Sequence, residues 1–236
     1  MSYMAHAQEC PVIRIETKNT ALILKAGRNR QLYQAYLGTR LNCNSAYDAL
    51  ARENTKSFVV NDGNPLVDLR HLAYPTHGTE NLFEPAIRLT HDDGNPSLEL
   101  VYLSHTTLEK DDHTSETIIR LKDPQYPVDV TLHYKSFHDQ DAIEQWVEIQ
   151  HQEKNPVMLY NYASSMLHLN ANNYWLTQYH GDWAKEARMQ ESELTRGTKV
   201  IDSKLGVRTN MYHTPVFFLS MNSKAEADPE VRPRSG

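Results

Sequence analysis

Apolar and polar residues alternate with a period of two along much of this chain of 236 residues. The clearest case lies within Pro127 to Phe137, where apolar residues alternate with Asp129, Thr131, His133 and Lys135. The apolar set is Val128, Val130, Leu132 and Tyr134. Because successive side chains of a β-strand point to opposite faces, this pattern predicts a strand that is half buried in a sheet.

The same period predicts further strands at short spacing. They are expected at Val12–Thr17, Thr20–Lys25, Gln31–Leu37, Ile143–Ile149, Val157–Leu167, Tyr174–Tyr179 and Pro215–Met221. The turn-forming Asp92–Asn95 is expected to join Ile87–Leu89 to Leu98–Leu103 as a hairpin. The one helix-like window, Ser45–Asn54, is short. Many strands without alternating helices indicate an all-β protein, a large antiparallel β-sandwich with few short helices.

Composition narrows the class of protein further. With 39% hydrophobic residues, the chain has enough apolar side chains for one large domain or two small ones. The 24 Lys and Arg residues against 30 Asp and Glu residues give a net charge of −6, so neither nucleic acid nor a membrane is expected as a partner. Cys10 and Cys43 allow at most one disulfide and exclude a four-cysteine zinc site.

The two ends of the chain differ from the rest. The first ten residues lack the charged start and the apolar stretch of a secretory signal, although Ala5-His6-Ala7 resembles the site where one is cut. A cytoplasmic location and export from a shortened signal therefore both stay open. Residues 1–19 are expected to form an N-terminal extension with a candidate first strand, and residues 223–236 a polar tail without aromatic residues.

Common catalytic and metal-binding patterns do not occur in the sequence. None of the twelve His residues falls into a metal-binding spacing, and the nine glycines form no phosphate-binding loop. The carboxylates of Asp92-Asp93 and Asp111-Asp112 lie in polar turns, where solvent is expected to hold their pKa values near normal. We therefore expect no catalytic residue, no metal site and no cofactor in this chain.

A cluster of aromatic and polar residues is more informative. Asn172-Asn173-Tyr174-Trp175 is followed by a second stretch, His180–Glu186, that contains Trp183. An aromatic ring flanked by amides and carboxylates suits a sugar, because the C–H face of a pyranose stacks on the ring while its hydroxyls form hydrogen bonds. The alternative is structural: Trp175 belongs to the core, and Trp183 fills a turn.

Several short motifs follow one another along the chain. They are Tyr74-Pro75-Thr76-His77-Gly78, Glu84-Pro85-Ala86, Asp93-Gly94, Val130-x-Leu132-x-Tyr134, and Gly181-Asp182-Trp183-Ala184-Lys185-Glu186 with Gly197 eleven residues later. In order and spacing, the chain resembles the N-terminal module of glycoside hydrolase family 36, the α-galactosidases, from about residue 20 to residue 222. The resemblance implies a β-supersandwich that precedes a (β/α)₈ barrel, and the barrel carries both catalytic aspartates.

The resemblance also assigns site residues. Trp183 matches the tryptophan that reaches toward the galactose pocket in the family, often the pocket of a neighbouring subunit, and is the expected substrate-binding residue. A pocket aspartate of some members corresponds to a position between Tyr47 and Asn54, with Asp48 as a candidate. Asn81-Leu82-Phe83-Glu84 departs from the Asp-Phe-Arg of many members. The chain also departs after Asn222, where the family continues into further strands, so the last strands of the sandwich are expected to be missing.

These observations lead to one main functional hypothesis and one alternative. The chain is expected to be the N-terminal module of an α-galactosidase-like enzyme, to support a catalytic barrel, and to contribute to the α-galactoside pocket of a homo-oligomer. Because the barrel is absent from this chain, we expect it to be inactive alone. The alternative is a stand-alone carbohydrate-binding or structural β-sandwich, with Trp175 and Trp183 as its sugar platform.

Overall fold

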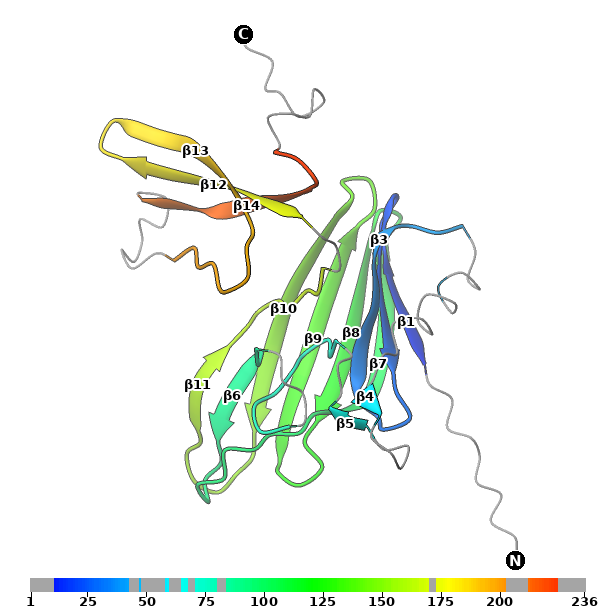
Figure 1. Ribbon diagram of the computed structural model, residues 1–236. Coiled ribbons are helices and arrows are strands. Elements are labelled where there is room, and N and C mark those ends of the chain that lie inside the picture. The colour runs from blue at the N-terminus through cyan, green and yellow to red at the C-terminus, as the bar shows by residue number, and fades with distance from the viewer. Residues whose placement is uncertain are drawn as a thin grey trace, which may run out of the picture. The chain divides into compact units, whose positions relative to one another are not determined.

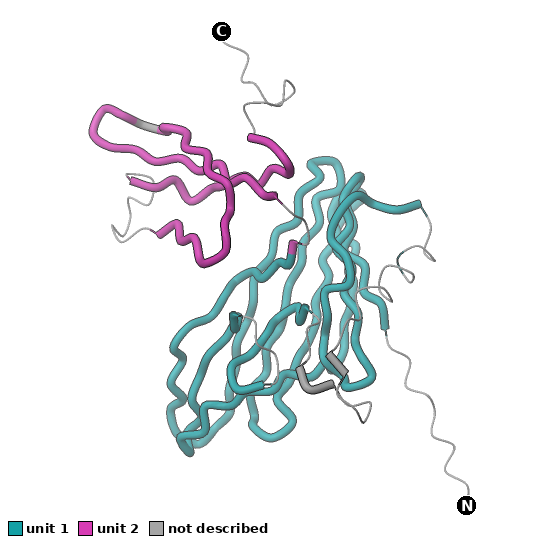
Figure 2. Tube along the Cα trace, viewed as in Figure 1, with its two compact units in different colours: residues 1–168 teal, residues 169–236 magenta. Residues whose placement is uncertain are grey.

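The computed structural model describes residues 11–42, 47, 58–59, 65–67, 71–79, 84–169, 173–202 and 212–224. These residues fall into two compact units, residues 1–168 and residues 169–236 (Figure 2). Asp48, both cysteines, residues 81–83 and most of the 223–236 tail lie outside the described residues. Of the expected helix Ser45–Asn54, the structure describes only Tyr47.

Unit 1 is built from antiparallel strands (Figure 1). Its strands are β1 (Val12–Glu16), β2 (Thr20–Ala26), β3 (Leu32–Thr39), β4 (Phe58–Val59), β5 (Pro65–Val67), β6 (Ile87–Thr90), β7 (Val101–Asp111), β8 (Thr114–Lys122), β9 (Val128–Phe137), β10 (Ala142–His151) and β11 (Met158–Tyr162). They form the sheets β1-β2-β3, β10-β9-β8-β7, β11-β6 and β4-β5. The all-β fold class predicted from the sequence is confirmed.

The main core of unit 1 lies where the three-stranded and four-stranded sheets contribute to one apolar cluster. The alternating residues of β9 predicted as apolar, Val128 to Tyr134, are all buried there. Ile13 and Ile15 of β1 and Leu22 and Leu24 of β2 belong to the same cluster. Shared burial of apolar faces is the main force that holds two sheets together, so the predicted sandwich has its physical basis in these alternating positions.

Strand β2 is buried on both faces. Leu22 and Leu24 belong to the main core, whereas Ala21 and Ile23 pack in a second cluster with Ala35 and Tyr47. The Tyr47 hydroxyl accepts a hydrogen bond from the Leu41 amide (2.7 Å) and donates one to the Glu16 carboxylate (3.0 Å). Burial on both faces explains why β2 appears in the sequence as a continuous apolar run.

The predicted hairpin between Ile87–Leu89 and Leu98–Leu103 is wrong in its pairing. The turn itself forms, since the Gly94 amide donates to the His91 carbonyl (3.0 Å). However, β6 pairs with β11, from Ile87 opposite Tyr162 to Thr90 opposite Met158. After the turn, the chain does not pair with β6. Instead, the Leu98 amide donates a hydrogen bond to the His77 carbonyl (3.1 Å).

A buried hydrogen bond between His91 and Glu153 fixes the start of that turn. The two nitrogens of the His91 ring face the Glu153 carboxylate (2.7 Å) and the Ser97 carbonyl (3.0 Å). The second carboxylate oxygen of Glu153 accepts from the Asp92 amide (2.8 Å). The side chains of His91 and Glu153 are 0% and 3% exposed, so the pair is desolvated. It ties the turn to the chain after β10.

Unit 2 contains three antiparallel strands in the order β13-β12-β14. They are β12 (Tyr174–Asp182), β13 (Lys185–Glu193) and β14 (His213–Met221). Strands β12 and β13 form a hairpin, and β14 pairs with the other edge of β12. Strand β14 carries exposed Phe217 and Phe218. The alternation in Tyr174–Tyr179 and Pro215–Met221 predicted β12 and β14 correctly.

Candidate functional site

Trp183, the predicted substrate-binding residue, lies at the tip of the β12–β13 hairpin. Asp182 and Lys185 are the last paired residues, and Trp183 and Ala184 form the turn between them. The Trp183 amide donates to the Asp182 carboxylate (2.7 Å), and Ala184 has φ 57°, in the left-handed region. The Trp183 side chain is 86% exposed. Trp183 therefore lies in a turn with polar neighbours and is not a core residue of the described structure.

Regular pairing on both sides of β12 supports this tip. The register of β12 against β13 runs from Trp175 opposite Glu193 to Asp182 opposite Lys185, with one irregularity between His180 and Asp182. At that irregularity the Gly181 amide donates to the Tyr212 carbonyl (2.9 Å), next to the start of β14. The paired strands thus fix the position of the backbone at this turn.

Trp175 lies at the opposite end of β12. It is half buried, opposite Glu193 on β13 and Ser220 on β14, and the Lys224 ammonium lies 5.4 Å from its ring centroid. Trp183 comes eight positions after Trp175 along extended chain, which corresponds to about 26 Å. One sugar ring cannot contact both indoles. The alternative of a carbohydrate-binding β-sandwich that uses these tryptophans at separate places stays a prediction.

Unit 2 also has an apolar hollow of about 430 Å³. Its lining residues are Leu176, Leu194, Lys199, Ile201, Pro215, Val216, Phe217 and Leu219. Lys199 supplies the only charged side chain in this lining. A sugar needs several fixed donors and acceptors for its hydroxyls, so the hollow is poorly suited to one.

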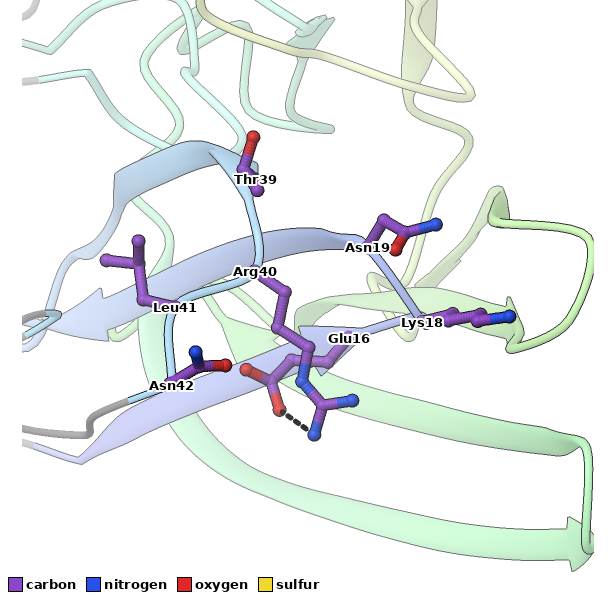
Figure 3. A pocket seen from close by; sticks show the side chains of 7 residues that line it. All are labelled: Glu16, Lys18, Asn19, Thr39, Arg40, Leu41 and Asn42. Carbon is purple, nitrogen blue, oxygen red and sulfur yellow. Dashed lines mark ion pairs between the residues drawn. The ribbon is translucent and has the colours of Figure 1, made fainter.

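A polar hollow of about 410 Å³ lies at the ends of β1 and β3 in unit 1 (Figure 3). Its lining residues are Glu16, Lys18, Asn19, Thr39, Arg40, Leu41 and Asn42. An Arg40 guanidinium nitrogen lies 3.6 Å from the Glu16 carboxylate, and the second guanidinium nitrogen donates to the Thr17 carbonyl (3.3 Å). Burial raises the pKa of the Tyr47 hydroxyl that binds Glu16. Glu16 and Arg40 are thus engaged with each other and with their own sheet.

The expected ordinary pKa values of the turn aspartates are wrong for Asp93 and Asp111. The Asn95 amide, followed by the Tyr126 hydroxyl, lowers the pKa of Asp93. The His113 amide lowers the pKa of Asp111 in the same way. Hydrogen bonds from local donors stabilise the charged carboxylate, which solvent exposure alone would not do. Both groups act as turn-forming acceptors, and a lowered pKa is the opposite of what a catalytic acid needs.

Histidines and acidic residues do not gather into a larger cluster within the described part of the chain. No group of three or more His, Cys, Asp or Glu side chains there is arranged to hold a metal ion. The described residues also contain no helix that is long and apolar enough to cross a membrane. Of the departing segment Asn81–Glu84, only Glu84 is described, and it is exposed.

With this geometry in view, the sequence can be compared with known proteins. Residues 30–232 match the Glycosyl hydrolase family 36 N-terminal domain. The chain belongs to this family. The resemblance inferred from the ordered motifs is thereby confirmed, and the exposed tryptophan belongs to a family 36 N-terminal domain.

Curated relatives of this family 36 domain are much longer proteins. Probable alpha-galactosidase C and probable alpha-galactosidase G of Aspergillus terreus are 25% and 26% identical to it over 171 and 173 residues. Each match covers 67% of this chain and 23% of the relative. The chain thus spans about a quarter of the length of these relatives.

Solved structures share the fold of this domain. The alpha-galactosidase of Lactobacillus brevis has a TM-score of 0.79 and 23% identity, over 92% of this chain and 32% of that chain. A family 36 alpha-galactosidase of Geobacillus stearothermophilus has a TM-score of 0.78 and 16% identity, over 90% of this chain and 32% of that chain. The domain therefore has the fold of about one third of each of these chains.

Proposed function

We propose that this chain acts as the N-terminal module of an α-galactosidase-like glycoside hydrolase. The proposed module comprises residues 20–222, with residues 1–19 as an extension and residues 223–236 as a polar tail. It supports a catalytic (β/α)₈ barrel and contributes Trp183 to a pocket for α-galactosides. The observation that carries the proposal is the 86% exposed Trp183 at the tip of a paired hairpin in a family 36 N-terminal domain.

The chemistry of Trp183 suits this role. Exposing an indole to water forfeits the stabilisation of roughly 1.5–3 kcal/mol that burying a large apolar side chain provides. The flat ring offers a surface for the C–H face of a pyranose, and Asp182 and Lys185 place a carboxylate and an ammonium beside the turn. We infer that the indole forms one wall of the pocket and the barrel forms the rest.

We assign the reaction to the part of the enzyme that corresponds to the region of the relatives outside the match with this chain. Retaining hydrolysis of a glycoside requires two carboxyl groups about 5 Å apart, one as nucleophile and one as acid and base. We propose that both lie on the barrel. A solved complex of a Geobacillus stearothermophilus relative with raffinose supports α-galactosides as the ligand class. We further propose that the complete enzyme is a homo-oligomer in which Trp183 faces a neighbouring subunit.

A chimaera tests this function. This chain replaces the matching third of the Lactobacillus brevis alpha-galactosidase, and turnover of p-nitrophenyl α-galactoside is measured. We expect an active enzyme. Trp183→Ala is expected to lower its kcat/KM, and the decrease corresponds to a loss of about 1–3 kcal/mol in transition-state stabilisation, as for other aromatic side chains that anchor a ligand. Trp183→Phe retains a ring and is expected to recover most of the loss.

The matched control is Tyr162→Ala, which removes an aromatic side chain that is 60% exposed on β11. It is expected to leave kcat/KM unchanged. An inactive chimaera that folds would contradict the supporting role of the module. Equal kcat/KM values for the chimaera with Trp183 and with Trp183→Ala would contradict the role of the indole.

A further inference from the structure

One histidine is enclosed on the side of the four-stranded sheet that faces away from the main core. His133 of β9 points to this side, because its neighbours Leu132 and Tyr134 belong to the main core and successive side chains of a strand alternate. Its ring stacks on the indole of Trp146, the residue opposite on β10, with ring centroids 4.6 Å apart and planes that differ by 11°. The His133 side chain is only 10% exposed. The stack therefore holds the imidazole in a fixed plane.

A carboxylate of β8 fixes the tautomer of this ring. Nδ1 of His133 lies 3.1 Å from the Glu116 carboxylate, and the second oxygen of Glu116 lies 2.9 Å from the Lys110 ammonium. Hydrogen bonds from Lys110 first, and then from His133, lower the pKa of Glu116, so this carboxylate is ionised and can only accept. Nδ1 of the neutral ring therefore carries the proton and donates it to Glu116. The lone pair of the ring lies on Nε2.

Nε2 of His133 faces a second carboxylate without a hydrogen bond. This nitrogen is buried and forms no hydrogen bond with any part of the chain that the structure describes. The Glu148 carboxylate of β10 lies 3.7 Å from it, which is too long for a hydrogen bond. In the neutral ring, two electron-pair acceptors thus face each other. Buried polar atoms nearly always have a partner, and a cation between these two atoms satisfies both.

We propose that Nε2 of His133 and the Glu148 carboxylate bind a zinc ion. A zinc ion about 2.0–2.2 Å from a nitrogen and an oxygen, at the tetrahedral angle, holds these two atoms roughly 3.4 Å apart. The observed 3.7 Å approaches this separation, and the Glu148 side chain is 56% exposed and free to adjust. Two protein ligands leave the other two positions of the ion to water, so the ion exchanges with solvent. The site is independent of the proposed role of Trp183.

The ligand types and their supports favour zinc over the common hard cations. Calcium and magnesium prefer oxygen ligands alone, whereas an imidazole nitrogen suits zinc. Glu116 supplies the outer carboxylate of a carboxylate–histidine–zinc arrangement, which orients the ring and makes Nε2 more basic. His133 and Glu148 are 15 residues apart in the sequence and come together only through the pairing of β9 with β10. No local spacing of histidines could therefore indicate this site.

A zinc titration of the intact chain tests the site. The chain is treated with EDTA, dialysed at about pH 7.5, where an ordinary imidazole is neutral, and titrated with zinc chloride. Nitrogen-15 NMR follows the histidine rings and the Trp146 indole. We expect one equivalent of zinc to shift the Nε2 signal of His133 while Nδ1 stays protonated. The Trp146 signal is expected to shift with it, because the two rings are stacked.

Variants assign the binding to this pair. Glu148→Gln removes the charge of an exposed ligand, and His133→Gln removes the nitrogen ligand, so both are expected to abolish the one-equivalent binding. Glu148→Gln keeps the test open if His133→Gln does not fold. Glu116→Gln leaves both ligands in place and is expected to weaken zinc affinity about 10–100-fold, as for other outer carboxylates.

The matched control is His113→Gln. His113 also faces a carboxylate, with Nδ1 2.6 Å from Asp139, but these side chains are 67% and 60% exposed. This variant is expected to bind zinc as the unchanged chain does. An unshifted His133 ring up to about 1 mM zinc would overturn the proposal. A His133 ring that keeps protons on both nitrogens in the presence of zinc, or equal zinc affinity of the unchanged chain and Glu148→Gln, would overturn it as well.

Discussion

Trp183 illustrates how exposure decides the consequence of changing one residue. Because its side chain is 86% exposed, Trp183→Ala removes little buried surface. We expect the free energy of unfolding to change by no more than about 0.5 kcal/mol, as for surface substitutions in general. Urea denaturation followed by circular dichroism measures this change.

Leu132→Ala, in the core of β9, serves as the contrast and should cost about 2–5 kcal/mol. A loss of about 3 kcal/mol for Trp183→Ala would show that the indole is a packing residue.

Glu153, in contrast to the exposed Trp183, is a buried side chain whose partner, His91, is also buried. Glu153→Ala leaves the enclosed His91 ring without its carboxylate and the Asp92 amide without an acceptor. We expect a loss of about 1–3 kcal/mol in the free energy of unfolding for each of these buried groups, because a buried polar group without a hydrogen-bond partner is destabilising. Glu148→Ala removes a carboxylate that is 56% exposed and should cost no more than about 1 kcal/mol. Equal effects of the two substitutions in urea denaturation would refute the role of the buried pair.

At the level of elements, the alternation of residues predicted strands wherever the inward side chains are apolar. The predicted β1, β2, β3, β9, β10, β12 and β14 agree with the structure to within a few residues. Strand β8 was missed because Ser115 and Thr117 occupy two of its buried positions. Strand β13 was missed because most of its residues are polar or charged. Val157–Leu167 forms a strand only from Met158 to Tyr162. Pairing partners such as β6 with β11 depend on long-range contacts that no local pattern contains.

The candidate site shows a similar division between local and long-range information. The motif around Trp183 predicted a sugar-binding side chain, and its placement in a turn was given only as part of the structural alternative. The separation of Trp175 from Trp183 follows from the full length of β12, which extends to Asp182 rather than to Tyr179. The stacking of His71 on His168 was missed because the two residues are 97 residues apart in the sequence.

The turn of the β12–β13 hairpin contains backbone strain that a substitution can relieve. Ala184 has φ 57°, a conformation that costs a residue with a Cβ about 1–2 kcal/mol. Ala184→Gly removes that cost but adds about 0.5–1 kcal/mol of backbone entropy to the unfolded chain. We expect a net gain of up to about 1 kcal/mol in the free energy of unfolding, measured by urea denaturation. Ala142→Gly, at the first residue of β10, is the control and is expected to destabilise. A loss of stability for Ala184→Gly would contradict the strained turn.

At the scale of the whole molecule, the histidines predict how stability depends on pH. Burial lowers the pKa values of His71, His105 and His168 in the folded protein. The unfolded chain therefore binds more protons below about pH 6.5, and the free energy of unfolding is expected to decrease as the pH falls from about 7.5 to about 5.5. The urea midpoint at several pH values measures this. A midpoint that rises as the pH falls through that window would contradict the lowered pKa values of these half-buried histidines.

Carboxylates affect the free energy of unfolding at lower pH than the histidines do. Hydrogen bonds from Thr17 first, and then from Asn19 and Thr20, lower the pKa of Asp141 at the turn between β9 and β10. Its contribution to stability is present above the ordinary aspartate pKa and is lost as the pH falls through the lowered value. Loss of stability between about pH 7.5 and about pH 5.5 is therefore assigned to histidines rather than to this carboxylate.

The central claim is that the chain is a supporting module whose chemistry lies elsewhere in the enzyme. It is tested most directly by incubating the purified chain of 236 residues with p-nitrophenyl α-galactoside and following the release of nitrophenol. The account predicts no turnover above the buffer rate, because the two carboxylates of a retaining hydrolase must be held together in a preorganised pocket. Turnover that is abolished by changing a carboxylate of this chain, such as Asp182→Asn next to Trp183, would contradict it.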